Sequence, residues 1–404
     1  MMPIIFRIPF LGRDLPSYGL MMMIGFMVAI VWAARRAAKS KANPDVVLNC
    51  GFIALLAGVV GCRFMYVVHY WDQFKNRGDA GQVFLAIIDV TKGGLEFYGG
   101  FILTVIAVVI WLRWREKVSL RWYLDIIAPS AALGLAFGRV GCLLNGCCFG
   151  GVCDLPWAVR FPFGSPAAIQ QWGQKLPEAG LREELIFIHE PTGLAQPLSR
   201  EILTVPEEEI ARAETTIAEL TGQTAARQAE LSRASNNAEK QRLTRELAEL
   251  NRKLNAAKLE HVGIHTLMKK YGLTFAELRA IAAEHRSLPV HPTQLYSMVT
   301  ALLIALLLSA VYWRRTRDGQ VVCALFVIQP LARWLIEVIR ADNPVDTMGF
   351  TISQFLAVCM TIAGLIGFWV LRRMPPRSPR AHPWEPPPEE GPSRKKGKHA
   401  ATRA

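Results

Sequence analysis

Long apolar runs alternate with short polar segments along most of this chain. Seven of these runs are candidate spans, and several of them approach the ~20 residues that an α-helix needs to cross a bilayer. They cover residues 19–34, 46–69, 95–112, 124–144, 295–313, 321–339 and 352–371. Apolar residues make up 51% of the sequence. We therefore predict an all-α membrane protein with seven transmembrane helices.

The positions of the basic residues predict how these helices are oriented. The formal net charge of +13 could suggest nucleic-acid binding, but the basic residues gather after the first, third, fifth and seventh runs. Loops rich in Lys and Arg face the cytoplasm. This places the N-terminus in the periplasm and the C-terminus in the cytoplasm, with no nucleic-acid partner. No cleavable signal peptide is expected, because residues 1–16 lack a basic start and a small-residue cleavage site.

A long polar segment separates the fourth and fifth runs and would lie in the periplasm. Residues 206–259 carry apolar residues at heptad spacing, which predicts a coiled coil. Ser235-Asn236-Asn237 suggests a helical hairpin, and one continuous helix is the alternative. No catalytic grouping is evident here, so this insert is predicted to be a spacer or a partner-binding arm.

Four parts follow from this pattern. They are an N-terminal membrane part (1–162), the periplasmic insert with its coiled-coil hairpin (163–289), a C-terminal membrane part (290–373) and a Pro-rich, then basic tail (374–404). The tail is expected to be disordered in the cytoplasm.

Charged residues gather where several predicted helices meet the outer membrane surface. Arg139 lies in the glycine-rich segment 138–150, and an arginine at membrane depth is costly unless it is paired or hydrated. Arg333, Glu337 and Arg340 are spaced to share one helix face. A snorkelling arginine and a chance salt-bridge ladder would look similar.

The second and third runs add Arg63 and Glu96 to the same surface, and Glu96 is expected to pair with Arg63 or Arg139. Arginine side chains can hold phosphate oxygens in a bidentate fork. We therefore expect an anionic lipid head group here, with an arginine pair stabilising its phosphate as a leaving group.

Four of the eight cysteines crowd the outer end of the fourth run, namely Cys142, Cys147, Cys148 and Cys153. A disulfide is compatible with an oxidising periplasm. Because no Cys-x-x-Cys pair or nearby His is present, we expect no metal site and no cofactor, and we interpret these thiols as structural.

Taken in order, several motifs resemble those of the prolipoprotein diacylglyceryl transferase family. The resemblance covers about 12–162 and 290–371 and omits the insert and the tail. Its motifs are Ser17-Tyr18-Gly19-Leu20, Gly61-Cys62-Arg63, Leu95-Glu96-Phe97-Tyr98-Gly99-Gly100, Asp125-Ile126-Ile127-Ala128-Pro129, the segment 138–150, Trp157-Ala158-Val159-Arg160-Phe161-Pro162, His291-Pro292-Thr293-Gln294-Leu295-Tyr296 and Arg333 to Arg340.

This resemblance implies a multi-pass enzyme of the bacterial inner membrane. It would transfer the diacylglyceryl group of phosphatidylglycerol to the lipobox cysteine of preprolipoprotein signal peptides, forming a thioether and releasing glycerol phosphate. The implied catalytic residues are Arg139, Arg333, Glu337 and Tyr98. The implied substrate-binding residues are Tyr18, Arg63, Glu96, Asn145, Gly150, His291, Gln294, Tyr296 and Arg340.

The chain departs from the family pattern at three places. Tyr98 stands where the family has histidine, Cys142 and Cys147 stand where it has Asn and Glu, and Gln329-Pro330 replaces Tyr-Gly. The base that ionises the acceptor thiol is therefore left open among Tyr98, Glu96 and water. The alternatives are a related enzyme with another acceptor and a non-catalytic lipid transporter or scaffold.

Overall fold

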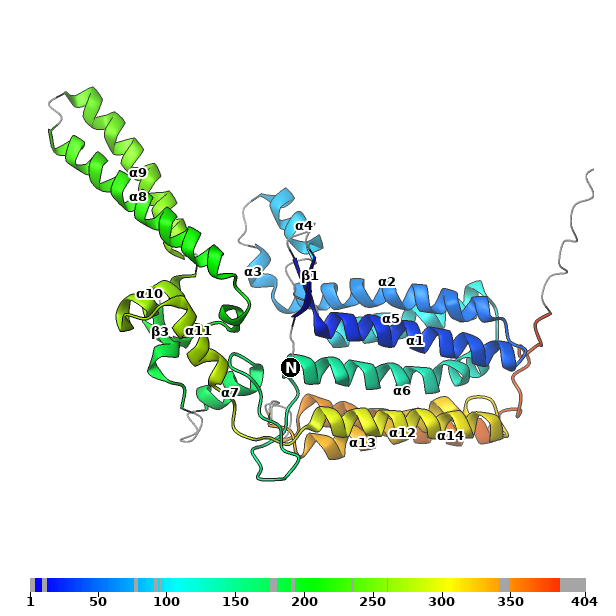
Figure 1. Ribbon diagram of the computed structural model, residues 1–404. Coiled ribbons are helices and arrows are strands. Elements are labelled where there is room, and N and C mark those ends of the chain that lie inside the picture. Colours follow the sequence, from blue (N-terminus) through cyan, green and yellow to red (C-terminus); the bar gives the residue numbers. More distant parts are fainter. Residues whose placement is uncertain are drawn as a thin grey trace, which may run out of the picture. The chain divides into compact units, whose positions relative to one another are not determined.

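The computed structural model describes residues 4–8, 13–75, 79–90, 94, 96–174, 180–189, 193–233, 236–259, 261–341 and 349–385. Within them, seven helices are long and apolar enough to cross a membrane, which confirms the predicted fold class (Figure 1). They are α1 (Ser17–Lys39), α2 (Pro44–His69), α5 (Phe97–Ile110) with its π-helical continuation η1 (Trp111–Arg115), α6 (Leu120–Asn145), α12 (Thr293–Arg314), α13 (Gln320–Glu337) and α14 (Ile352–Arg373).

The other elements are shorter or lie in the polar insert. They are β1 (Ile4–Ile8), β2 (Arg13–Pro16), α3 (Trp71–Lys75), α4 (Ala80–Ile88), α7 (Pro166–Gly173), η3 (Glu183–Leu185), β3 (Ile186–His189), β4 (Leu194–Pro197), η4 (Arg200–Leu203), α8 (Glu207–Arg233), α9 (Asn237–Leu259), α10 (Val262–Tyr271) and α11 (Phe275–Glu284). β1 pairs with β2 and β3 pairs with β4, both antiparallel.

The chain divides into two compact units. The first contains residues 1–23, 136–299 and 333–355, and the second contains residues 24–135, 300–332 and 356–404. Each is described by itself below.

Small residues bring the helices of the second unit close together. Ala37, Ala132 and Ala305 are buried in its core, and small side chains let helix backbones approach closely in membranes. A Cβ placed on Gly61 of α2 would lie 2.5 Å from the carbonyl oxygen of Gly99 in α5. Large apolar side chains on the same helices are exposed, as expected of surfaces that face lipid acyl chains.

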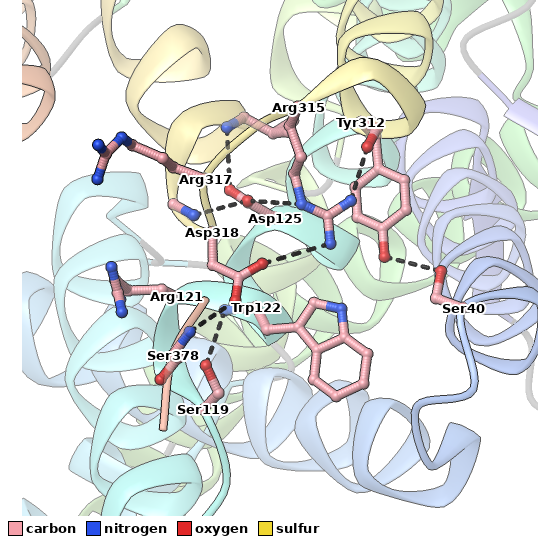
Figure 2. Close-up of polar contacts among 12 residues, drawn as sticks. Ser40, Ser119, Arg121, Trp122, Asp125, Tyr312, Arg315, Arg317, Asp318 and Ser378 are labelled. Atoms are coloured by element: carbon pink, nitrogen blue, oxygen red, sulfur yellow. Dashed lines mark hydrogen bonds and ion pairs between the residues drawn. The ribbon is translucent and has the colours of Figure 1, made fainter. Parts of the chain in front are cut away.

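A buried carboxylate joins three of these helices in the second unit (Figure 2). Asp125 of α6 accepts hydrogen bonds from the backbone N–H groups of Gly319 (2.7 Å), Val321 (3.0 Å) and Val322 (2.9 Å). These are donors that the start of α13 leaves without intrahelical acceptors. Arg315, just after α12, places its Nε 3.4 Å from Asp125 Oδ2. The carboxylate thus fixes the start of α13 against α6.

The segment after α14 is bonded to the same cluster. The backbone N–H of Ser378 donates to Asp318 Oδ2 (2.9 Å) (Figure 2). The backbone N–H of Asp318 donates to the carbonyl of Pro376 (2.9 Å). Further along, the backbone N–H of Trp384 donates to the carbonyl of Lys41 (2.8 Å). We expected disorder from residue 374 onward, whereas residues 374–385 form this C-terminal clasp. The rest of the expected tail lies outside the described residues.

In the first unit, α8 and α9 are two helices that pack against each other, not one continuous helix (Figure 1). Leu243, Leu247 and Leu254 of the predicted seam are buried. Ile210, near the start of α8, belongs to a separate apolar core shared with α10 and α11. A capping box begins α11, where the Thr274 side chain accepts from the Glu277 N–H.

Candidate functional site

The end of α13 carries the predicted charged cluster of the first unit. The Glu337 carboxylate is fully buried and forms an ion pair with Arg333. Arg340 Nη1 lies 3.7 Å from the same Glu337 oxygen, Oε2. Both arginine side chains are also largely buried. The predicted helical register thus accounts for the Arg333–Glu337 pair, whereas Arg340 reaches the same carboxylate from the turn that follows α13.

Two hydroxyl groups near the start of α14 also bond to this cluster, and the sequence did not predict either of them. The Thr351 hydroxyl donates to Glu337 Oε1 (3.0 Å), and Arg333 Nη2 donates to the Ser353 hydroxyl (3.3 Å). Thr351 precedes α14 as an ordinary helix-capping residue, so its sequence carries no separate signal of this role.

The predicted Gly150 lies between the start of α12 and the end of α13. Its N–H donates to the carbonyl of His291 (3.0 Å), and it forms a β-bridge with Arg340. A Cβ on Gly150 would lie 2.6 Å from the His291 Cβ, so this close approach requires glycine. These contacts hold Arg340 beside the glycine-rich segment.

Arg139 differs from the other arginines of the first unit's cluster. It is half-buried, and within the described part of the chain its guanidinium has no hydrogen-bond or ion-pair partner. It lies within electrostatic range of Arg333 and of Cys148. Tyr18 packs against the same stretch of α6, since a Cβ on Gly141 would lie 3.1 Å from the Tyr18 ring. A half-buried arginine without a carboxylate is available to an anionic ligand.

The predicted residues at the start of α12 hold the loop that follows α6. Gln294 Nε2 donates to the carbonyl of Cys147 (2.8 Å), and the Thr293 hydroxyl donates to the carbonyl of Cys148 (2.6 Å). His291 Nδ1 lies 3.5 Å from the Tyr296 hydroxyl, which accepts from Trp157 Nε1 (2.8 Å). In this structure these side chains position the loop and each other.

Asn145, predicted to bind substrate, is bonded to a residue that the sequence did not single out. Arg200 of η4 donates from Nη2 to Asn145 Oδ1 (3.2 Å) and from Nη1 to the Asn145 carbonyl (3.3 Å). A cation at a helix C-terminus is stabilising. A Cβ on Gly164, where φ is +66°, would lie 2.1 Å from the Arg200 Cβ. Residues 164 and 200 are far apart in the sequence, so no local pattern predicted this close contact.

The turn after α6 brings three cysteines together. Gly146 has a φ of +78°, and the Cys147 N–H donates to the Cys142 carbonyl (3.2 Å). This is the Schellman arrangement, which places the side chains of these two positions in contact. Cys148 has a left-handed φ of +61°, and its sulfur lies with those of Cys142 and Cys147 within 4.8 Å of one another. Cys153 is not part of this group.

Cys148 is electrostatically distinct. Hydrogen bonds from Cys142 and then Cys147 hold the pKa of the Cys148 thiol well below its usual range, and the positive charges of Arg340 and Arg139 act in the same direction.

The other predicted site residues belong to the second unit, where two of them have unexpected partners. Arg63 donates from Nε to the Ile87 carbonyl (2.7 Å) and from Nη2 to the Ala86 carbonyl (2.6 Å), and thus binds the end of α4. Glu96, for which we expected Arg63 or Arg139 as partner, pairs with His69. Its Oε1 lies 2.7 Å from Nδ1 of His69. Tyr98 is exposed on α5.

The sequence of this chain matches that of a known protein family. The sequence profile described as prolipoprotein diacylglyceryl transferase matches residues 3–204 and 245–370. It therefore extends further into the insert than the motifs do, and within the insert it omits residues 205–244, which hold α8 and the start of α9.

Several curated relatives carry the name phosphatidylglycerol–prolipoprotein diacylglyceryl transferase. The relative from Rhodopirellula baltica is 37% identical over 161 residues, which are 40% of this chain and 32% of the relative. The relative from Pseudoalteromonas translucida is 37% identical over 153 residues, 37% of this chain and 55% of the relative. The relative from Aliivibrio salmonicida is 37% identical over 166 residues, 41% of this chain and 56% of the relative. These matches thus span between a third and just over half of the relatives' length.

Proposed function

Because the chain belongs to the prolipoprotein diacylglyceryl transferase family, we propose that it transfers the diacylglyceryl group of phosphatidylglycerol to a cysteine thiol. The proposed acceptor is the lipobox cysteine of a preprolipoprotein signal peptide. The products are a thioether and glycerol phosphate. The proposed setting is the bacterial inner membrane, with the reacting groups at its periplasmic face.

The available guanidinium of Arg139 is the observation that carries this proposal. Among the described residues, the positive charges of Arg139 and Arg340 act on Arg333, and Arg333 and Arg340 both lie beside the carboxylate of Glu337. A lipid phosphodiester would bring its negative charge to this group of arginines. Arg139 would bind the phosphate directly, because its donors have no acceptor within the described residues.

Glu337 gives the cluster its geometry in this proposal. The buried carboxylate holds Arg333 at the end of α13 and Arg340 just after it, so neither arginine has to be ordered when the lipid binds. As the acceptor sulfur attacks the glycerol carbon, negative charge grows on the departing phosphate oxygen. Fixed guanidinium groups stabilise that charge without reorganising.

A labelled-lipid transfer assay tests the proposal. The purified chain is mixed with phosphatidylglycerol labelled in an acyl chain and with a lipobox peptide, and the label should move to the peptide. A peptide with serine in place of cysteine is the control. Transfer to another thiol acceptor alone would favour the related enzyme, and lipid binding without transfer would favour a scaffold.

We predict that the hairpin formed by α8 and α9 is not needed for the chemistry. Most of it falls in the segment that the family profile omits, and no predicted site residue lies in it. Replacing residues 211–256 with a short Gly/Ser bridge would retain Ile210 in its core and should leave transfer within about threefold of wild type. Loss of transfer in a folded deletion variant would make the hairpin part of the site or of substrate delivery.

We predict that Tyr98 is a hydrogen-bond donor and not the base. Ionising a phenol at pH 7 costs about 4 kcal/mol, against about 2 kcal/mol for the acceptor thiol. Tyr98→Phe should therefore lower transfer only about tenfold and leave the rise of rate with pH to the acceptor thiol. The measurement is the pH–rate profile with a lipobox peptide.

The pH–rate profile of Tyr98→Phe is compared with that of His69→Gln. His69 is the imidazole that pairs with Glu96 in the same unit. If Tyr98→Phe abolishes transfer in folded protein and raised pH does not restore it, Tyr98 is the base and this assignment is wrong.

A further inference from the structure

The three thiols at the end of α6 form a group that neither the family name nor the phosphate-binding arginines explain. Cys142 is buried, Cys147 and Cys148 are half-buried, and all three are free thiols. Their sulfur atoms lie within 4.8 Å of one another. A Zn²⁺ ion bound to thiolates at about 2.3 Å holds its sulfur ligands about 3.8 Å apart. The sulfur atoms therefore need to move by no more than about 1 Å to bind one ion.

We propose that Cys142, Cys147 and Cys148 bind one Zn²⁺ ion and leave its fourth coordination position open. Thiolates select soft or borderline metals, and three protein ligands with one open position are typical of reactive zinc sites. This replaces the expectation of no metal, which rested on the absence of a Cys-x-x-Cys spacing and of a nearby His.

The backbone that carries the three thiols is fixed in position, as a metal-binding loop requires. The Schellman turn at Gly146 fixes Cys147 against Cys142, and the left-handed Cys148 reverses the chain again. Thr293 and Gln294 bind the carbonyls of Cys148 and Cys147, and both of these side chains are buried. Hydrogen bonds from residues that surround the ligands help to orient the ligands of a metal.

The Gln294 side chain has one hydrogen-bond acceptor that a ligand could use. Its Nε2 is used by Cys147, and its buried Oε1 has no hydrogen-bond partner among the described residues. A buried amide oxygen without a donor is costly. An acceptor peptide bound beside Cys147 could supply the missing N–H.

The charge of the site also fits a zinc–thiolate group. Three thiolates and one Zn²⁺ carry a net charge of −1, and Arg340 and Arg139 lie within electrostatic range of Cys148. The arginines therefore balance the group, and the two sites share Arg139 as a neighbour.

The open position suggests a role that rests on the proposed transfer reaction. The acceptor thiol would bind zinc as a thiolate and release its proton to water, because a coordinating thiol is deprotonated outright. Its sulfur then forms the bond to the glycerol carbon. The carbon–oxygen bond to the phosphate breaks with its electron pair on oxygen, and glycerol phosphate leaves.

Metal analysis of the full-length chain in detergent tests zinc binding without measuring activity. We expect one zinc per chain in the wild type and in Cys153→Ser, the matched control outside the group. We expect loss of bound zinc in Cys142→Ser, Cys147→Ser and Cys148→Ser. For variants that fail to fold, wild-type protein provides the test, because zinc should protect these three thiols from maleimide and a chelator should expose them. A disulfide between any two of them, bound copper in place of zinc, or no protection by zinc would overturn the proposal.

Cobalt substitution tests the open position. The visible absorption bands of Co²⁺ in the wild-type site should shift when a lipobox peptide is added and should not shift with its serine counterpart. Unchanged bands with both peptides would overturn the role of the fourth position. Transfer by zinc-free protein would refute the role of zinc in the reaction and leave the proposed function intact. Zinc binding without transfer would refute only the proposed function.

Discussion

Arg139→Lys and Arg333→Lys should each lower diacylglyceryl transfer by about a hundredfold or more. Lysine keeps the charge but loses the planar fork that binds two phosphate oxygens at once. Removing one preorganised donor from developing negative charge typically has an effect of this size on rate. Arg139 should lose lipid affinity as well as rate, because its donors have no other acceptor among the described residues.

The rate and the apparent lipid affinity are measured in the labelled-lipid assay. Arg212→Lys is the matched control, because Arg212 forms an exposed ion pair on α8 far along the chain from the predicted site. It should transfer at the wild-type rate. Wild-type rates in both Arg139→Lys and Arg333→Lys would show that neither arginine binds the phosphate.

Glu337→Gln should abolish transfer and also destabilise the first unit. The carboxylate is fully buried between Arg333 and Arg340, and removing one partner of a buried ion pair typically costs about 3–5 kcal/mol. Glutamine can still accept the Thr351 hydrogen bond, so the loss reports on charge and not on that contact. A lower thermal-unfolding midpoint in detergent and lost transfer are the expected readouts.

Glu208→Gln is the matched control for this change. Glu208 forms an ion pair with Arg212 at the same helical spacing, but both side chains are more than four-fifths exposed. Exposed pairs contribute at most about 1 kcal/mol, so the unfolding midpoint should barely change. Equal effects of the two substitutions would mean that Glu337 does not organise the arginines.

The sequence predicted the features that depend on local periodicity. Apolar runs of sufficient length specify helices in a membrane whatever their neighbours are, because only a helix satisfies its own backbone there. The pairing of Arg333 with Glu337 follows from helical geometry alone. The separation of α8 from α9 likewise follows from a polar break in a heptad pattern.

The features that the sequence did not predict depend on where the chain turns. Cys142 and Cys147 are five residues apart, and only the left-handed Gly146 folds one sulfur back onto the other. The Gly146 position after an apolar helix was a usable signal for this contact. The bond from Arg200 to Asn145 and the pairing of His69 with Glu96 required tertiary structure, because no local pattern relates the residues involved.

The C-terminal clasp has a consequence for how the protein is made. Residues 376–384 follow all seven apolar helices in the chain, yet they complete the hydrogen bonds of Asp318 and reach the carbonyl of Lys41 after α1. During synthesis this segment is translated after all seven transmembrane helices. The Asp318 side of the cluster therefore remains incomplete until translation has passed Ser378. A nascent chain stopped at Arg373 would hold all its transmembrane helices without this fastening, and a quality-control protease could distinguish it from the finished protein.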